Sequence, residues 1–341
     1  MGGKESKEHS IDGLTIAKEK GSASWYCSLG DSSYSRGDYQ KSAELYKQAI
    51  SIAREGRDKE IEAYAYYSLG GSYYNLKDFE KSAECAKQAL GISKEVENKE
   101  GEAVGYCALA ESYEGLEDYQ ASIQYANQAL SIANEVGNRV REARAYRSLS
   151  RSYYSLKDYT ESTRCAGQAL SIAKEVGNKL SEVRAYNSLA WSYYSLKDYA
   201  ESTRCATQAT SIAKKVGDRE TEASAYRVLT WSYYHLNDYQ ESTRCAKQLI
   251  SIAKEVGDKV TEADAYRAMA MSYDSLGDQQ QSVDCAKEAE RIDREVGGTV
   301  TGATVVLLQE QPPDSGNKES IQEELYAAEG GISNNSSGNK V

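Results

Sequence analysis

The chain is almost without proline. Only Pro312 and Pro313 occur among its 341 residues. Because proline removes a backbone donor and breaks helices, residues 1–311 can form uninterrupted helices joined by turns that use Gly, Asn and Asp. Phenylalanine is also scarce, with one residue against 28 tyrosines. Almost every aromatic side chain except the three tryptophans therefore carries a hydroxyl group.

Signals of catalysis, secretion and membrane insertion are missing too. The chain has two histidines, His9 and His235, and no Cys-x-x-Cys pair, so no residues have the spacing of a metal site. Neither a glycine-rich phosphate loop nor a catalytic set of residues is found. The longest apolar run, residues 305–308, cannot span a bilayer, and the N-terminus has no apolar secretion segment. We therefore expect a cytoplasmic protein that is not an enzyme and has no cofactor.

The net charge of −11 argues against nucleic acid as a partner, because a uniformly acidic surface repels phosphate backbones. The seven cysteines are an odd number and fit a reduced, intracellular protein. Five of them share one repeat position: Cys85, Cys165, Cys205, Cys245 and Cys285. Packed helices lie about 10 Å apart, beyond disulfide reach, so these cysteines are predicted to be small packing residues.

A period of 40 residues dominates the sequence. The most regular series are Tyr26, Tyr66, Tyr106, Tyr146, Tyr186, Tyr226 and Tyr266, then Asp38, Asp78, Asp118, Asp158, Asp198, Asp238 and Asp278. Seven copies in register, without an insertion, predict an array of seven identical structural units. Such units bury their apolar faces by stacking on their neighbours.

Each unit is predicted to contain two helices. In the fourth unit Tyr146, Leu149 and Tyr153 share one helical face. Asp158 can cap a second helix running from about residue 160 to 176. Gly177 can then end that helix in the left-handed conformation. The fold predicted from the pattern alone is all-α.

The residue pattern resembles the tetratricopeptide repeat family. The third unit shows its signature in Tyr106, Leu109, Ala110, Tyr113, Asp118-Tyr119, Ser122 and Ala129. The resemblance implies a right-handed superhelical solenoid of seven helix–turn–helix repeats that binds proteins. The usual repeat has 34 residues. The 40-residue form is similar to the arrays of the scaffolds LGN and rapsyn, and the usual proline after the second helix is replaced, for example by Lys174.

Three regions are expected. Residues 1–18 are predicted to form an N-terminal arm and a capping half-repeat, and residues 19–298 the seven-repeat solenoid. Residues 299–341, rich in Gly, Ser and Asn, are predicted to be a mostly disordered tail with a possible short helix at 320–329. That acidic, amphipathic helix suits the groove and raises the possibility of autoinhibition. Gly2 matches the N-myristoylation pattern, so membrane contact is expected only if Gly2 is modified.

In the tetratricopeptide repeat family the first helices line a concave groove, so variable first-helix positions are candidate contacts. In units four to seven these positions hold arginines and aromatic residues, which are typical anchors for acidic groups and for partners in general. The candidate partner-binding residues are Arg144, Arg147, Arg151, Tyr154, Arg184, Asn187, Trp191, Tyr194, Arg227, Trp231, Tyr234 and Arg267. The predicted ligand is an acidic extended or helical peptide, and the predicted function is that of an interaction scaffold or adaptor.

Alternatives remain open at this point. The arginines could instead pair with Glu and Asp on adjacent helices. The chain could be a myristoylated, membrane-linked clustering adaptor, or the regulatory fragment of a larger signalling protein. The clamp for C-terminal carboxylates found in chaperone-binding repeats is excluded, because its Lys and Asn positions hold Cys27, Asp31, Tyr67 and Gly71.

Overall fold

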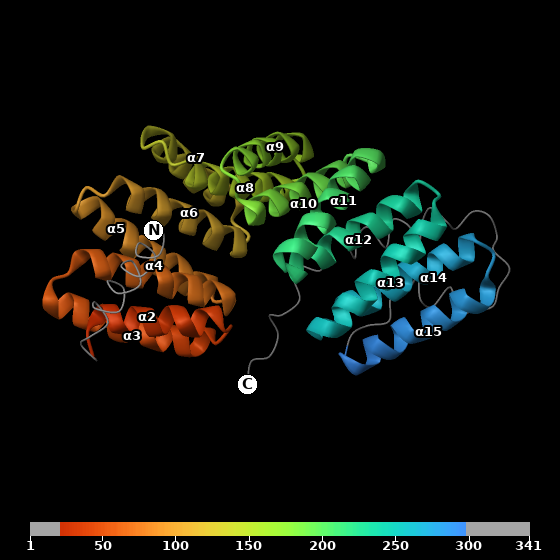
Figure 1. Cartoon of the computed structure of the whole chain (residues 1–341), viewed down its shortest axis with the longest axis horizontal. Helices are drawn as coiled ribbons and strands as arrows, with labels where there is room; N and C mark the ends of the chain where they lie inside the picture. Colours follow the sequence, from red (N-terminus) through yellow and green to blue (C-terminus); the bar gives the residue numbers. More distant parts are fainter. Residues whose placement is uncertain (1–20, 298–341) are drawn as a thin grey trace, which may run out of the picture. The chain divides into compact units, whose positions relative to one another are not determined.

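The computed structural model describes residues 21–297. Within this range every element is an α-helix (Figure 1). The first helices of the repeats are α2 (Ala23–Ser35), α4 (Lys59–Asn75), α6 (Lys99–Gly115), α8 (Arg139–Ser155), α10 (Lys179–Ser195), α12 (Arg219–His235) and α14 (Lys259–Ser275). The second helices are α3 (Tyr39–Gly56), α5 (Phe79–Glu95), α7 (Tyr119–Glu135), α9 (Tyr159–Glu175), α11 (Tyr199–Val216), α13 (Tyr239–Val256) and α15 (Gln279–Glu295). The predicted all-α repeat architecture is confirmed.

One type of turn joins the helices. Between α8 and α9, Lys157 adopts a left-handed conformation with φ 63°. The amide of Asp158 donates to the carbonyl of Tyr153 at 2.9 Å, and the amide of Lys157 donates to that of Tyr154 at 2.9 Å. Asp158 then caps α9 by accepting a hydrogen bond from the amide of Glu161. Left-handed residues recur every 20 residues from Gly37 to Gly297, so both turns of a repeat use this C-terminal motif.

The chain divides into two compact units, Met1–Ser192 and Tyr193–Val341. In unit 1 each helix packs against the next, as α2 does against α3 and α3 against α4. The first helices α2, α4, α6 and α8 also contact one another in sequence. The first helices therefore lie on the inner side of the bend in this unit. In unit 2, α12 and α14 show the same direct contact.

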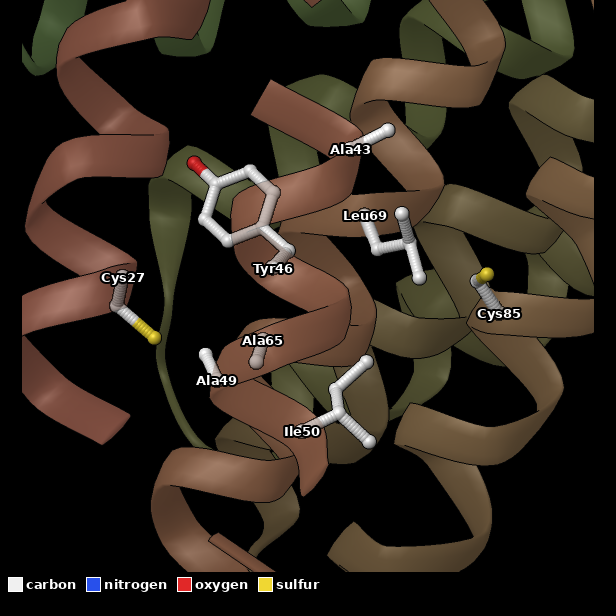
Figure 2. Close-up of a cluster of buried hydrophobic side chains, with 8 residues drawn as sticks. All are labelled: Cys27, Ala43, Tyr46, Ala49, Ile50, Ala65, Leu69 and Cys85. Carbon is white, nitrogen blue, oxygen red and sulfur yellow. The ribbon is translucent and has the colours of Figure 1, made fainter. Parts of the chain in front are cut away.

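The core between the helices is built largely from small side chains. In the first two repeats it consists of Cys27, Ala43, Tyr46, Ala49, Ile50, Ala65, Leu69 and Cys85 (Figure 2). All seven cysteines are buried and reduced, and Figure 2 shows Cys27 and Cys85 at opposite sides of this cluster. The burial of the repeated cysteines confirms their predicted packing role. Because their side chains are small, adjacent helices can approach closely.

A buried pair of serines joins each repeat to the next. One serine comes from a second helix and the other from the following first helix, 30 residues later. The pairs are Ser42–Ser72, Ser82–Ser112, Ser122–Ser152, Ser162–Ser192, Ser202–Ser232 and Ser242–Ser272, with oxygens 2.7 to 3.1 Å apart. Because a buried hydroxyl is costly without a partner, this pairing explains why the serine register is kept.

The predicted segments at the ends of the chain lie outside the described residues. These are the capping half-repeat at 1–18, the lipidation candidate Gly2, and the tail at 299–341 with its helix at 320–329. Capping, lipid attachment and autoinhibition therefore remain predictions. The described helices of the solenoid run from Ala23 to Glu295, within the predicted boundaries 19–298.

Candidate functional site

The inner face of unit 1 gathers polar side chains from four consecutive first helices. We call it the first-helix surface of unit 1. It consists of Asp31 and Tyr34 on α2, Tyr64, Tyr67 and Tyr74 on α4, Glu111 and Glu114 on α6, and Arg144, Arg147 and Arg151 on α8. Arg144 donates to the hydroxyl of Tyr67 at 2.7 Å although the two residues are 77 positions apart. Side chains two repeats apart are thus in direct contact here.

Glu111 is the centre of this surface. Both of its oxygens accept from the guanidinium of Arg144, the Nε bond being 2.9 Å long, and Arg147 donates to it at 2.8 Å. The side chain of Glu111 is only 14% exposed. Burial by itself would raise its pKa, but the charges and hydrogen bonds of Arg144 and Arg147 outweigh burial and lower the pKa to about 2. Glu111 is therefore ionised and serves as a shared counter-charge.

Glu114 provides a second counter-charge, to Arg151. The two side chains form an ion pair at 2.7 Å. Burial nevertheless raises the pKa of Glu114, with Arg151 opposing that effect and Glu111 adding to it. One oxygen of Glu114, Oε2, and the Nε of Arg147 are buried without a hydrogen-bond partner among the described residues. Such groups are uncommon in folded proteins.

The alternative of internal ion pairing therefore describes Arg144, Arg147 and Arg151 well, since each has a glutamate partner. Their charges are not fully balanced, because three arginines face two glutamates. Burial lowers the pKa of Arg147, and the charge of Arg184 on α10 acts on Arg147 as well. The arginine cluster, defined as Glu111, Glu114 and the three arginines of α8, keeps a surplus positive charge next to Arg184.

The remaining candidates in unit 1 lie on α8 and α10. Tyr154 packs against Tyr159 with ring centroids 5.3 Å apart. Arg184, Asn187 and Trp191 are half-buried on α10. These three residues lie on the first helix of the fifth repeat, at positions whose residue type varies between repeats.

In unit 2 several predicted anchors are packed inside. Trp231 is 7% exposed and Tyr194 4% exposed. The hydroxyl of Tyr194 lies 3.2 Å from Nε2 of His235. Arg267 is buried and bonds both oxygens of Asp293 at 2.6 Å. Trp231, Tyr194 and Arg267 therefore contribute to packing inside the unit and expose little area to a partner. Arg227 and Tyr234 are half-buried.

Exposed tyrosines in the first two repeats were not among the candidates. Tyr64 is 46% exposed and Tyr34 37% exposed. Tyr64 donates to Asp31 at 2.9 Å, and Asn75 donates to the hydroxyl of Tyr34 at 2.8 Å. Both tyrosines occupy the same variable first-helix positions as the predicted anchors, so the repeat register could have identified them.

Within residues 21–297 no helix has the length and apolar character needed to cross a membrane, and no group of His, Cys, Asp and Glu side chains is arranged to hold a metal. Burial raises the pKa of the Cys107 thiol to about 11 and that of Cys165 to about 11. These two thiols are therefore protonated at neutral pH and poor nucleophiles.

Comparison with known proteins places this arrangement among repeat proteins. The family model described as "Tetratricopeptide repeat" matches five overlapping segments, residues 21–95, 61–135, 101–175, 141–215 and 182–255. In the comparison with curated proteins, no sequence matched.

Solved structures show the same fold at low sequence identity. The apo form of RapI is 17% identical, with a TM-score of 0.62, covering 81% of this chain and 98% of its own. Aspartyl phosphate phosphatase F from Bacillus subtilis is 17% identical, with a TM-score of 0.62, covering 86% and 74%. A signal transduction ATPase from Pyrococcus horikoshii with a tetratricopeptide repeat sensor is 19% identical, with a TM-score of 0.66, covering 83% and 44%.

Proposed function

Because this chain belongs to the tetratricopeptide repeat family, whose repeats serve as scaffolds for protein–protein interaction, we propose that it is a non-enzymatic adaptor. It binds an extended or helical peptide on the first-helix surface of unit 1, and the peptide carries an acidic side chain. The observation that carries this proposal is the surplus positive charge of the arginine cluster, in which the Arg147 side chain is 20% exposed. A carboxylate of a ligand would balance that charge.

The surroundings of the cluster support a peptide ligand. Tyr34 and Tyr64 of the same first-helix surface expose large rings, and tyrosine is typical of binding anchors because it buries a large area with few rotatable bonds. A Rap protein, 18% identical and of the same fold, with a TM-score of 0.59, has been solved in complex with Competence and Sporulation Factor, covering 83% of this chain and 78% of its own. A fold of this kind thus accommodates a ligand in at least one other protein.

The proposed ligand needs fewer acidic side chains than the sequence pattern indicated. The pattern favoured a basic, aromatic surface across repeats four to seven, suited to an acidic extended or helical peptide. Since Glu111 and Glu114 already offset most of the charge of Arg144, Arg147 and Arg151, one or two acidic side chains suffice for a ligand. The remaining contacts would be aromatic and polar.

The test is selection of peptides from a random displayed library, followed by titration of the selected peptides against variants. Arg147→Gln keeps Glu111 paired with Arg144 but removes the surplus charge. The matched control is Arg164→Gln, since Arg164 pairs with Glu161 on the exposed face of α9. We expect peptides with a recurring Asp or Glu and a loss of affinity of about tenfold in Arg147→Gln, with none in the control. Selected peptides without an acidic position, or equal affinity for both variants, would refute the proposal.

A further inference from the structure

A second site lies away from the first-helix surface. It is a depression of about 680 Å³ between the second helices α3 and α5 and the start of α4. Its charged lining residues are Arg54, Arg57, Lys59, Lys87, Glu62 and Glu95. We call it the Arg57 pocket. With four basic and two acidic side chains, it has a formal charge of +2 in a protein whose net charge is −11.

The two acidic side chains of the pocket form ion pairs with two of its basic side chains. Arg54 donates from Nε to Glu62 at 2.7 Å. Lys59 lies between Glu62 and Glu95, at 3.5 and 3.4 Å. Lys87 donates to the neutral hydroxyl of Tyr113 at 2.9 Å, and among residues 21–297 Arg57 forms no ion pair. Two cations therefore keep their charge without a counter-charge, and Arg57 is exposed.

Arg57 occupies a backbone conformation that disfavours it. Its φ is 57°, in the left-handed region where residues with a Cβ are strained. The equivalent residue in five of the other six repeats is glycine: Gly137, Gly177, Gly217, Gly257 and Gly297. An arginine at this turn thus lowers local stability, and no ion pair of its side chain within the described residues compensates for it.

A second lining position of the pocket, Gly91, shows the opposite substitution. Gly91 lies in the interior of α5, where glycine weakens a helix. The equivalent positions hold Ser51, Ser131, Ser171, Ser211, Ser251 and Arg291. A Cβ at Gly91 would meet no atom within 4 Å, so packing does not require a glycine there. Two locally unfavourable residues, both departing from the other repeats, therefore meet in one basic depression.

We propose that the Arg57 pocket binds a ligand carrying a phosphate group. The guanidinium of Arg57 can hold two phosphate oxygens at once, and Lys87 adds a point charge. Gly91 leaves its part of the lining without a side chain, and the volume is that of sites for small molecules. The phosphate belongs either to a small phosphorylated compound or to a phosphorylated side chain of a protein. This inference does not depend on the peptide site, which lies on the first helices.

The test uses pyrophosphate as a small probe, and a serine-phosphorylated peptide together with its unphosphorylated form as the protein-derived probe. Binding to the whole chain is measured by calorimetry at fixed salt, because ionic strength screens exposed charges. Arg57→Gly removes the charge and relieves the backbone. Gly91→Leu adds a bulky side chain to the lining without changing charge and favours the helix. Neither change should reduce stability, so a lost signal cannot come from unfolding. Lys157→Gly is the matched control, a left-handed lysine at another turn.

We expect saturable binding of at least one phosphorylated probe, weakened about tenfold or more by Arg57→Gly, weakened by Gly91→Leu and unchanged by Lys157→Gly. Binding of pyrophosphate alone would assign a small ligand, and binding of the phosphopeptide but not its unphosphorylated form would assign a protein segment. Absence of binding to both probes, or equal affinity in Arg57→Gly, would overturn the proposal. Binding that is lost in Arg57→Gly but kept in Gly91→Leu would place the anion outside the pocket and overturn the assignment as well.

Discussion

Removing the charge of Glu111 should destabilise unit 1 strongly. In Glu111→Gln the guanidinium groups of Arg144 and Arg147 lose the carboxylate that both of them contact. The pKa of Glu111 is lowered from 4.5 to about 2. At 1.36 kcal/mol per pH unit, this difference corresponds to about 3 kcal/mol of stability at neutral pH. A loss of that size agrees with the few kcal/mol that breaking a buried ion pair generally costs.

The stabilisation by Glu111 should decrease as the pH is lowered. A carboxyl group whose pKa is lower in the folded state stabilises the protein above its unfolded pKa, and this contribution disappears as the pH falls through the folded pKa. The contribution of Glu111 is therefore complete above about pH 5 and decreases toward pH 2. The free energy of unfolding should differ between wild type and Glu111→Gln by about 3 kcal/mol at pH 7 and by about 1 kcal/mol at pH 3.

Urea denaturation followed by helicity at these two pH values measures the difference. The control is Glu161→Gln, which removes an exposed glutamate paired with Arg164 on the same helix. Exposed pairs of this kind contribute about 0.5 kcal/mol or less. A difference for Glu111→Gln below about 1 kcal/mol at pH 7, or one that does not decrease with pH, would show that Glu111 is not the counter-charge of this cluster.

Three further outcomes follow from the repeat architecture. Asp158→Ala removes the side chain that caps α9 and should lower the free energy of unfolding by about 1 kcal/mol; an unchanged urea midpoint would contradict the capping role. Ser122→Leu forces a large side chain into the interface where Ser122 contacts Ser152 at 2.8 Å and should cost about 1–3 kcal/mol; thermal unfolding measures this, and a rise in the melting temperature would refute the close packing. Cys107, fully buried with its pKa raised to about 11, should react with a thiol reagent at pH 7 only after denaturation; rapid labelling of the native protein, read by intact mass, would contradict its burial.

The sequence predicted the local structure closely. The second helix of the fourth repeat was expected at about residues 160–176 and is found at Tyr159–Glu175. Asp158 was expected to cap it and does so. Such features were predictable because helix boundaries depend on residues a few positions apart, and every repeat presents the same local pattern.

The site was predicted less completely. The positions facing the inner side were identified from their variation between repeats, and Arg144, Arg147 and Arg151 do lie together there. Their partners Glu111 and Glu114 occupy the positions equivalent to Arg151 and Tyr154 one repeat earlier, but a list of positions does not show which side chains meet. The burial of Trp231 and Arg267 in unit 2 was likewise not evident, since the equivalent positions in unit 1 include the polar residues Asp31 and Arg147.

By itself, the sequence determined the 40-residue repeat, its two helices, their caps and the small residues that allow stacking. These follow from local backbone preferences and from a fixed spacing between contacts. Only the tertiary structure decided how the charges are balanced and where the surface is open. Arg144 meets Tyr67 at a separation of 77 residues, and Arg57 shares a depression with Gly91. Such contacts depend on the angle at which repeats stack and on the reach of long side chains, neither of which local patterns specify.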